Sequence, residues 1–204
     1  MALTTLPTAA LANDAVDNTK LNLADNYAFT GTVSGASDVA LISTQTTGSA
    51  SAIDFTGLDN TYNMYMVIYQ DLQFASADQT FIMRISDDNG STVKTSGYLS
   101  VTDFSYYDGG SLASNNNASV NFHVIATDVG NASDNRSCFG QIYFRTPATA
   151  RKHTFLGATS IYNDNGDVVI YNTATVYNTN QTFNAIRFLG SSNFAGTFKL
   201  YGYN

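Results

Sequence analysis

The stretch YNMYMVIYQDLQF (Tyr62–Phe74) is the clearest indication of a β-strand in the chain, because largely apolar positions alternate with mixed polar and aromatic ones. One alternating set is largely apolar: Tyr62, Met64, Met66, Ile68, Leu72 and Phe74. The other set mixes polar groups with tyrosines: Asn63, Tyr65, Val67, Tyr69, Asp71 and Gln73. A period of two is typical of a strand with one buried face. We therefore predict a half-buried strand whose first set faces the core.

The same alternation recurs along the chain from about residue 38, which predicts nine or ten short strands. Its apolar positions are Phe81, Met83 and Ile85; Val120, Phe122 and Val124; Cys138, Ile142 and Phe144; Phe155, Thr159 and Ile161; and Phe198 and Leu200. Strands of this number and spacing favour an antiparallel β-sandwich over residues 37–204. We expect a jelly-roll-like topology and leave an immunoglobulin-like sandwich open. The segments Asp88-Asn89-Gly90-Ser91 and Asn165-Gly166 predict type I′ hairpin turns.

The composition agrees with an all-β chain and excludes several classes of function. All 16 acidic residues are Asp, while Asn, Ser and Thr make up almost a third of the 204 residues. These residue types form helices poorly. The net charge is -7 and the nine basic residues are scattered, which disfavours a nucleic-acid groove. No apolar run is long enough for a membrane helix, and we expect no signal peptide.

Few residues offer chemistry, and we predict neither catalysis nor a bound metal or cofactor. His123 is out of phase with its apolar neighbours, which predicts a surface or interface histidine, and His153 follows two cations, which predicts a solvated cluster. Cys138 is in phase with apolar residues and is expected in the core. The paired carboxylates are Asp87 and Asp88, Asp103 and Asp108, and Asp164 and Asp167. We interpret the first and last pairs as turn chemistry.

Tyrosines are the stronger functional signal, because a flat apolar ring with a polar tip suits wet interfaces. Mid-strand tyrosines out of phase with the apolar set are predicted to contact sister subunits: Tyr65, Tyr69, Tyr143 and Tyr201. Tyr203 shares this phase. A second group precedes a glycine-rich loop and is predicted to contact a glycan or receptor: Tyr106, Tyr107 and Asp108.

Residues 1–36 have too few large apolar side chains for a core of their own. These side chains are Leu11, Val16, Leu21, Leu23, Tyr27, Phe29 and Val33. We predict an extended arm that packs against a partner, with a disordered leader as the alternative.

The segment AALANDAVDNTKLNLADNYAFTGTVSG resembles an N-terminal segment of tailed-phage virion proteins, and the ending AGTFKLYGYN resembles the last strand of their terminal sandwich domains. The two motifs cover about 40 of 204 residues. The resemblance implies a homo-oligomer, usually a trimer, that is assembled in the host cytoplasm and attached to the virion by its arm.

Three hypotheses follow from this resemblance and the composition. The first is a tail fibre or capsid-mounted fibre whose knob adheres to host surface glycans. The second is a capsid decoration or cement protein that stabilises the shell. The third is a glycan-degrading enzyme, which would need a carboxylate pair in a cleft.

Overall fold

The computed structural model describes residues 38–106, 112–120, 122–131, 133, 137–163 and 165–204, with only the backbone described for 112–120. The residues described form ten strands and no α-helix, which confirms the all-β prediction. The strands are β1 (Val39–Thr56), β2 (Met64–Phe74), β3 (Gln79–Ser86), β4 (Tyr98–Tyr106), β5 (Leu112–Val120), β6 (His123–Val129), β7 (Cys138–Arg145), β8 (Arg151–Tyr162), β9 (Val168–Gln181) and β10 (Ala185–Tyr203). Residues 38–204 make one compact unit, and the predicted arm lies outside the described residues.

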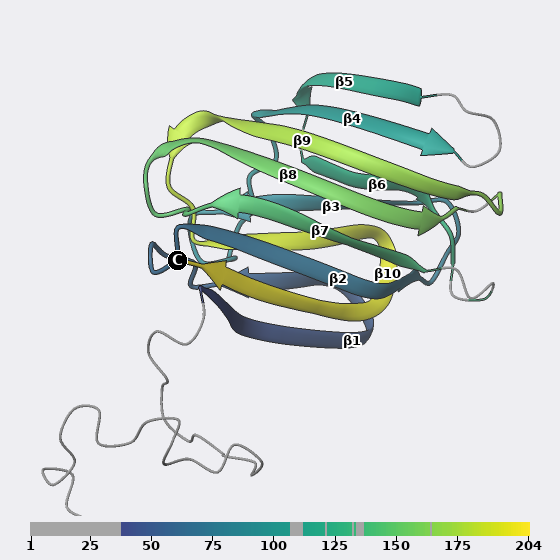
Figure 1. Ribbon diagram of the computed structural model, residues 1–204, viewed down its shortest axis with the longest axis horizontal. Helices are drawn as coiled ribbons and strands as arrows, with labels where there is room; N and C mark the ends of the chain where they lie inside the picture. The colour runs from purple at the N-terminus through teal and green to yellow at the C-terminus, as the bar shows by residue number, and fades with distance from the viewer. Residues whose placement is uncertain (1–37, 107–111, 121, 132, 134–136, 164) are drawn as a thin grey trace, which may run out of the picture. The chain divides into compact units, whose positions relative to one another are not determined.

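The strands form an antiparallel, nearly closed sandwich with the order β5-β4-β9-β8-β7-β2-β10-β3-β6, and β1 pairs with β10 (Figure 1). The last part of β10 pairs with β2, and its first part pairs with β3. The long strands β1 and β10 therefore pass from one layer of the sandwich to the other. The sequence predicted the antiparallel sandwich but left this strand order open.

The path of β10 between the layers depends on a close approach at Gly190. A Cβ atom at this position would collide with the ring of Phe74. The first ladder of β10 ends at Gly190, which pairs with Phe81, and the second begins at Phe194, which pairs with Phe74. Glycine at position 190 thus lets the strand turn around an aromatic side chain of the core.

Aromatic rings fill the space between the two layers. Phe81 of β3 lies among five other rings, with centroid distances of 5.2 Å to Tyr69 and 5.8 Å to Phe188. The other three are Phe74, Phe194 and Phe198, each 6.1–6.2 Å away. Four of these pairs are edge-to-face and the pair with Phe188 is stacked, and both arrangements add to the stabilisation from burial itself. The predicted core positions Phe81, Met83 and Ile85 are all fully buried, as expected.

A β-bulge in β2 makes the predicted orientation of Tyr65 and Tyr69 wrong. Asp71 has a positive φ of 53°, and the register with β7 shifts between Tyr69 and Leu72. The extra residue reverses the alternation, so Leu72 and Phe74 point to the same side as the tyrosines. Tyr65 is 2% exposed and Tyr69 is fully buried. Both tyrosines belong to the core, where Tyr65 stacks on Phe144 at 5.4 Å and the Tyr69 hydroxyl bonds with that of Thr159.

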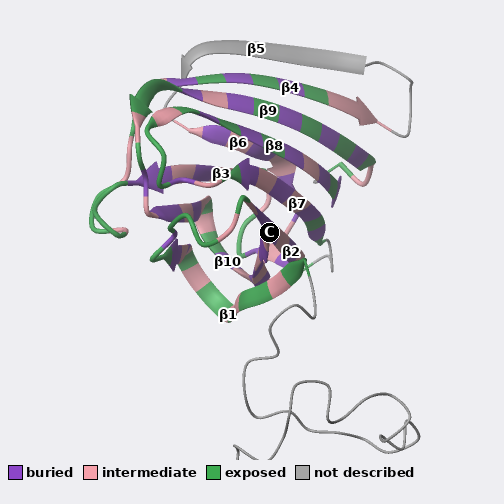
Figure 2. Ribbon diagram, turned by 60° about the vertical axis from the view of Figure 1, so that its left-hand side comes forward, coloured by how far each residue is buried: buried purple, intermediate pink, exposed green. Residues whose placement is uncertain are grey.

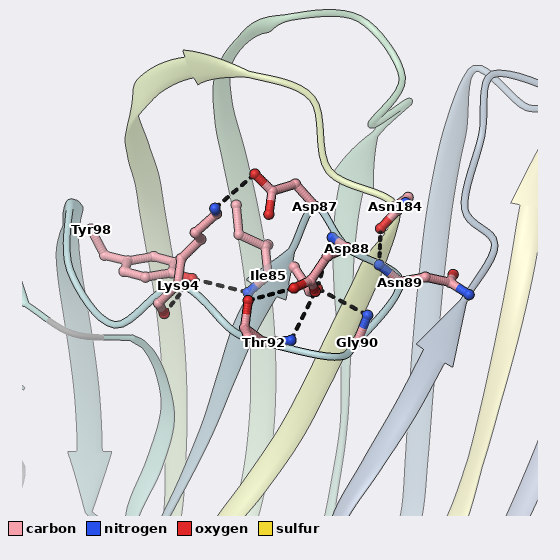
Figure 3. Close-up of polar contacts among 10 residues, drawn as sticks. Ile85, Asp87, Asp88, Asn89, Gly90, Thr92, Lys94, Tyr98 and Asn184 are labelled. Atoms are coloured by element: carbon pink, nitrogen blue, oxygen red, sulfur yellow. Dashed lines mark hydrogen bonds and ion pairs between the residues drawn. The ribbon is translucent and has the colours of Figure 1, made fainter.

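The turn of the first predicted hairpin is present, but the two strands beside it, β3 and β4, do not pair with each other, so the predicted hairpin is wrong. Asn89 and Gly90 have positive φ values of 59° and 88°, as a type I′ turn requires. Yet β3 pairs with β10 and β6, whereas β4 pairs with β5 and β9. The turn therefore begins a connection between the two layers (Figure 3).

The carboxylate of Asp88 organises that connection. It accepts hydrogen bonds from the Ser86 hydroxyl at 2.6 Å and from the backbone N–H and hydroxyl of Thr92 at 2.8 and 2.6 Å (Figure 3). These donors lower the pKa of Asp88 to about 2. The neighbouring Asp87 forms an ion pair with Lys94 at 2.7 Å. Turn chemistry, the interpretation favoured from the sequence, is confirmed for this pair of carboxylates.

The second predicted hairpin is confirmed, because β8 and β9 pair up to Tyr162 and Val168. Its turn is not type I′. Gly166 has a positive φ of 89°, but Asn165 is not among the residues with positive φ. The side chain of Asn163 closes the turn by accepting the Asp167 N–H at 2.7 Å.

Both histidines lie in the interior, contrary to the prediction. Val120 ends β5 and His123 begins β6, so an alternation counted from Val120 crosses a strand boundary. His123 is fully buried, with Nδ1 2.6 Å from the Thr175 hydroxyl. His153 is 2% exposed and donates its Nε2–H to the Gln181 carbonyl at 2.7 Å. Burial lowers both pKa values, that of His123 to about 3.

Candidate functional site

The outward face of the layer β4-β9-β8-β7-β2 carries several exposed large apolar side chains. Along β4, β8 and β9, buried residues alternate with exposed ones (Figure 2). Several exposed positions carry large apolar side chains, including Val101 at 44%, Leu156 at 58% and Ile170 at 50% exposure. A contiguous exposed apolar surface marks an interaction site more often than isolated apolar residues do. We therefore treat this face as the candidate site.

The strand registers align one apolar residue from each of seven strands, and we call these residues the cross-sheet row. From β4 to β1 they are Val101, Ala174, Leu156, Tyr143, Met66, Tyr201 and Leu41. Directly paired residues lie about 5 Å apart on a sheet, so neighbours in this row touch or nearly touch. The row thus makes a continuous apolar band across the layer.

The middle of the row is a cluster that we call the tyrosine–methionine patch: Tyr143, Met66, Tyr201 and Tyr203. Tyr143 and Tyr201 lie on either side of Met66 in the registers. The Tyr203 hydroxyl contacts the Met66 sulfur at 3.4 Å. Partial burial raises the pKa of Tyr203, and the phenols of Tyr143 and Tyr201 raise it further. All three tyrosines are only half-buried, so their rings are accessible to a partner.

Some of the predicted interface tyrosines therefore lie together on the outward face, and the others lie in the core. Tyr143 and Tyr201 lie on one outward patch, and Tyr203 joins them. Tyr65 and Tyr69 belong to the core and are not available to a subunit. Met66, which the alternation predicted to be buried, is 7% exposed, and its sulfur contacts the Tyr203 hydroxyl.

Of the predicted glycan contacts, Tyr106 lies at one end of this layer. Tyr106 ends β4 and is half-buried, with its ring edge-to-face against Phe104 at 5.6 Å. Partial burial raises its pKa, and the nearby carboxylates of Asp128 and Asp167 add to this effect. Tyr107 and Asp108 lie outside the described residues. The role of all three stays a prediction.

A hollow of about 350 Å³ opens on the same face over β7, β8 and β9. It is lined by Phe139, Gly140, Gln141, Ala158, Thr159, Ser160 and Ile170. The sequence analysis did not identify this hollow. The alternation in β7 contained a signal, since Phe139 is out of phase with the buried Cys138 and Ile142. Cys138 itself is fully buried as predicted, and burial raises the pKa of its thiol well above the usual range.

The described residues contain no cluster of three or more histidine, cysteine or acidic side chains that suits a metal ion. Among the same residues no helix has the length and apolar character to span a membrane. Asp103, a member of one carboxylate pair, is exposed on the outward face of β4, and its partner Asp108 lies outside the described residues.

No protein-family model matches the chain, and comparisons with curated proteins and with solved structures found no match.

Proposed function

We propose that the chain is a structural protein of a bacteriophage virion, the subunit of a tail fibre or capsid-mounted fibre. In this proposal residues 1–36 anchor it to other virion proteins, and its β-sandwich is a knob that adheres to host surface glycans. The subunit assembles with copies of itself, as a trimer, in the host cytoplasm. It works by binding and display, without a catalytic step or a cofactor.

The single observation that carries the proposal is the cross-sheet row with its tyrosine–methionine patch. Tyr and Met are enriched in the cores of protein interfaces. The proposed subunit contact is centred on this patch over β7, β2 and β10 and leaves the hollow over β7, β8 and β9 open.

The terminal motifs support the proposal that the assembly belongs to a phage particle. The face accounts for self-association, while the resemblance of the arm to phage virion segments accounts for attachment to a particle. The net charge of -7 keeps such a displayed domain soluble before assembly. A capsid decoration protein of the same fold is the alternative, since an arm that staples capsomers would have the same sequence character.

The mass of the purified chain in solution tests self-association. Light scattering after size-exclusion chromatography should give about three times the chain mass of 21.9 kDa. A Tyr201→Glu variant places a charge in the tyrosine–methionine patch and should dissociate the trimer, because burying an unpaired charge is costly. The matched control is Ser76→Glu in the exposed turn between β2 and β3, which should remain trimeric.

A wild-type protein that stays monomeric at all concentrations would contradict the proposed assembly. Equal dissociation of both variants would contradict the assignment of the interface to this face. The enzyme alternative is tested separately by comparing wild type with an Asp103→Asn, Asp108→Asn variant on host polysaccharide. Turnover that only the wild type shows would replace the binding role by a catalytic one.

A further inference from the structure

The hollow over β7, β8 and β9 exists because small side chains form its floor between larger ones. Ala158 and Ser160 point outward from β8 in its centre, while Leu156 and Tyr162 are the next outward residues on either side. The registers place Phe139 of β7 and Ile170 of β9 on opposite sides of Ser160. The result is a concave site with apolar walls, whose volume of about 350 Å³ is at the lower end of the range for ligand pockets.

The ring of Phe139 forms an aromatic wall of the hollow and is not packed in the core. Its side chain is 58% exposed, although the neighbouring positions Cys138 and Gly140 are buried. The face of an aromatic ring carries negative charge density, so it attracts the weakly positive C–H groups of a ligand. A pyranose ring presents several such C–H groups on one face and directs its hydroxyl groups outward around the rim. An exposed phenylalanine is thus suited to stack on a sugar.

Polar side chains of the right kind surround this wall. The next row of paired residues is Gln141, Ala158, Asn172 and Asp103, from β7 to β4. Amide side chains donate and accept hydrogen bonds, as hydroxyl groups do, so Gln141, Asn172 and Ser160 can bond with sugar hydroxyls. None of these three side chains has a hydrogen bond to another residue in the described part of the chain. Their polar groups are therefore available to a ligand.

The charges around the hollow define which sugars fit. Its lining residues are all uncharged, and the nearest charge in the adjacent row is the carboxylate of Asp103. No Lys or Arg lines the hollow to pair with a carboxylate or sulfate on a ligand. The net charge of -7 further repels an acidic polysaccharide. The chemistry therefore favours an uncharged pyranose over a uronic or sialic acid.

We propose that this hollow binds an uncharged pyranose unit of a glycan, which stacks on Phe139 and forms hydrogen bonds with Gln141, Ser160 and Asn172. The inference rests on the proposed function, to which it adds the binding residues and the class of sugar. It also moves the proposed glycan site from Tyr106, Tyr107 and Asp108 to the sheet near Tyr106, since Ile170 pairs with Ser105. Binding by one shallow site is weak, and several copies on one particle multiply its effect.

The experiment is a titration of the purified full-length chain, followed by saturation-transfer NMR of the ligand signals. The probes are the methyl glycosides of glucose, galactose, mannose and N-acetylglucosamine, with methyl glucuronide as the acidic comparison. At least one neutral glycoside should bind with a Kd in the millimolar range, and methyl glucuronide should bind more weakly. A Phe139→Ala variant should lower the affinity about tenfold, the size expected for one aromatic contact.

Two further variants make the test specific. Phe139→Tyr keeps the ring and should keep the affinity. Leu99→Ala is the matched control, because Leu99 is an exposed apolar residue on the outward face of β4, at 39% exposure, but belongs neither to the lining nor to the cross-sheet row. The affinity of this variant should change less than twofold. Thermal unfolding checks that each variant is folded.

The inference is overturned if no neutral glycoside binds at tens of millimolar, if methyl glucuronide binds best, or if both alanine variants lose affinity equally. These failures are distinguishable from failure of the proposed function. A protein found on the particle as a trimer, with no glycoside binding, would retain the structural role and refute only the sugar site.

Discussion

Acidification should destabilise the protein well before its carboxylates titrate, because His123 is buried in the neutral form. Its ring lies between β6 and β9, with Nδ1 2.6 Å from the Thr175 hydroxyl and Nε2 3.2 Å from the Thr173 hydroxyl. Thr175 also bonds with the Ser100 hydroxyl at 2.7 Å. Hydroxyl groups stabilise the neutral imidazole without supplying a negative charge, and burial lowers the pKa of His123 to about 3.

The sign and size of the effect follow from proton linkage. The unfolded chain binds a proton at His123 below the ordinary pKa of about 6.5, whereas the folded protein does so only near pH 3. Stability therefore falls as the pH drops below 6.5, by about 1.4 kcal/mol per unit, and the loss levels off near pH 3. Between pH 7.5 and 4.5 the loss from this residue should be about 3 kcal/mol. His153, whose pKa is also lowered by burial, changes stability in the same direction.

Urea unfolding, followed by circular dichroism at fixed protein concentration from pH 7.5 to 4.5, measures this loss. A His123→Gln variant retains an amide that can bond with the threonine hydroxyls but has no group that titrates. Its loss of stability over this range should be smaller than that of the wild type by about 3 kcal/mol. His153→Gln is the comparison and should remove only the part of the pH dependence of stability that comes from His153. A wild-type stability that does not change over this range, or an unchanged pH dependence in His123→Gln, would show that burial of neutral His123 does not make the fold sensitive to acid.

Two further predictions concern the core and the connection between the layers. Phe81→Ala removes the ring at the centre of the aromatic core and should cost about 3–5 kcal/mol in urea unfolding, and a loss below 1 kcal/mol would contradict the packing described. Asp88→Ala should lower the melting temperature more than Asp87→Ala, because Asp88 accepts three hydrogen bonds within the turn and Asp87 forms one ion pair. The reverse order in differential scanning calorimetry would show that the turn does not depend on Asp88.

Alternation in the sequence predicted the strands well but failed where a local irregularity interrupted it. Phe81, Phe155 and Phe198 are buried as their period-two patterns indicated. In β2 a single bulge at Asp71 reversed the inward and outward sets. Asp tolerates a positive φ, but the residue type alone does not show that the chain uses one there. The predicted interface tyrosines were therefore divided between core and surface.

Long-range pairing was the other feature that local pattern could not supply. The turn at Asn89-Gly90 has the predicted positive φ values, yet the strands beside it enter different layers. A turn fixes the direction of a few residues, whereas the choice of neighbouring strand depends on the packing of the whole sandwich. The cross-sheet row and the hollow likewise depend on seven and three strands respectively, whose registers are not visible in any one segment.

We propose that this chain is an appendage subunit of a phage particle, and immunogold electron microscopy of phage particles can locate it. Gold is expected at the distal parts of tail fibres or of fibres that project from the capsid. Gold spread evenly over the shell surface would contradict the fibre assignment in favour of the decoration protein. Particles without label, from infected cells that contain the protein, would contradict a role in the virion altogether.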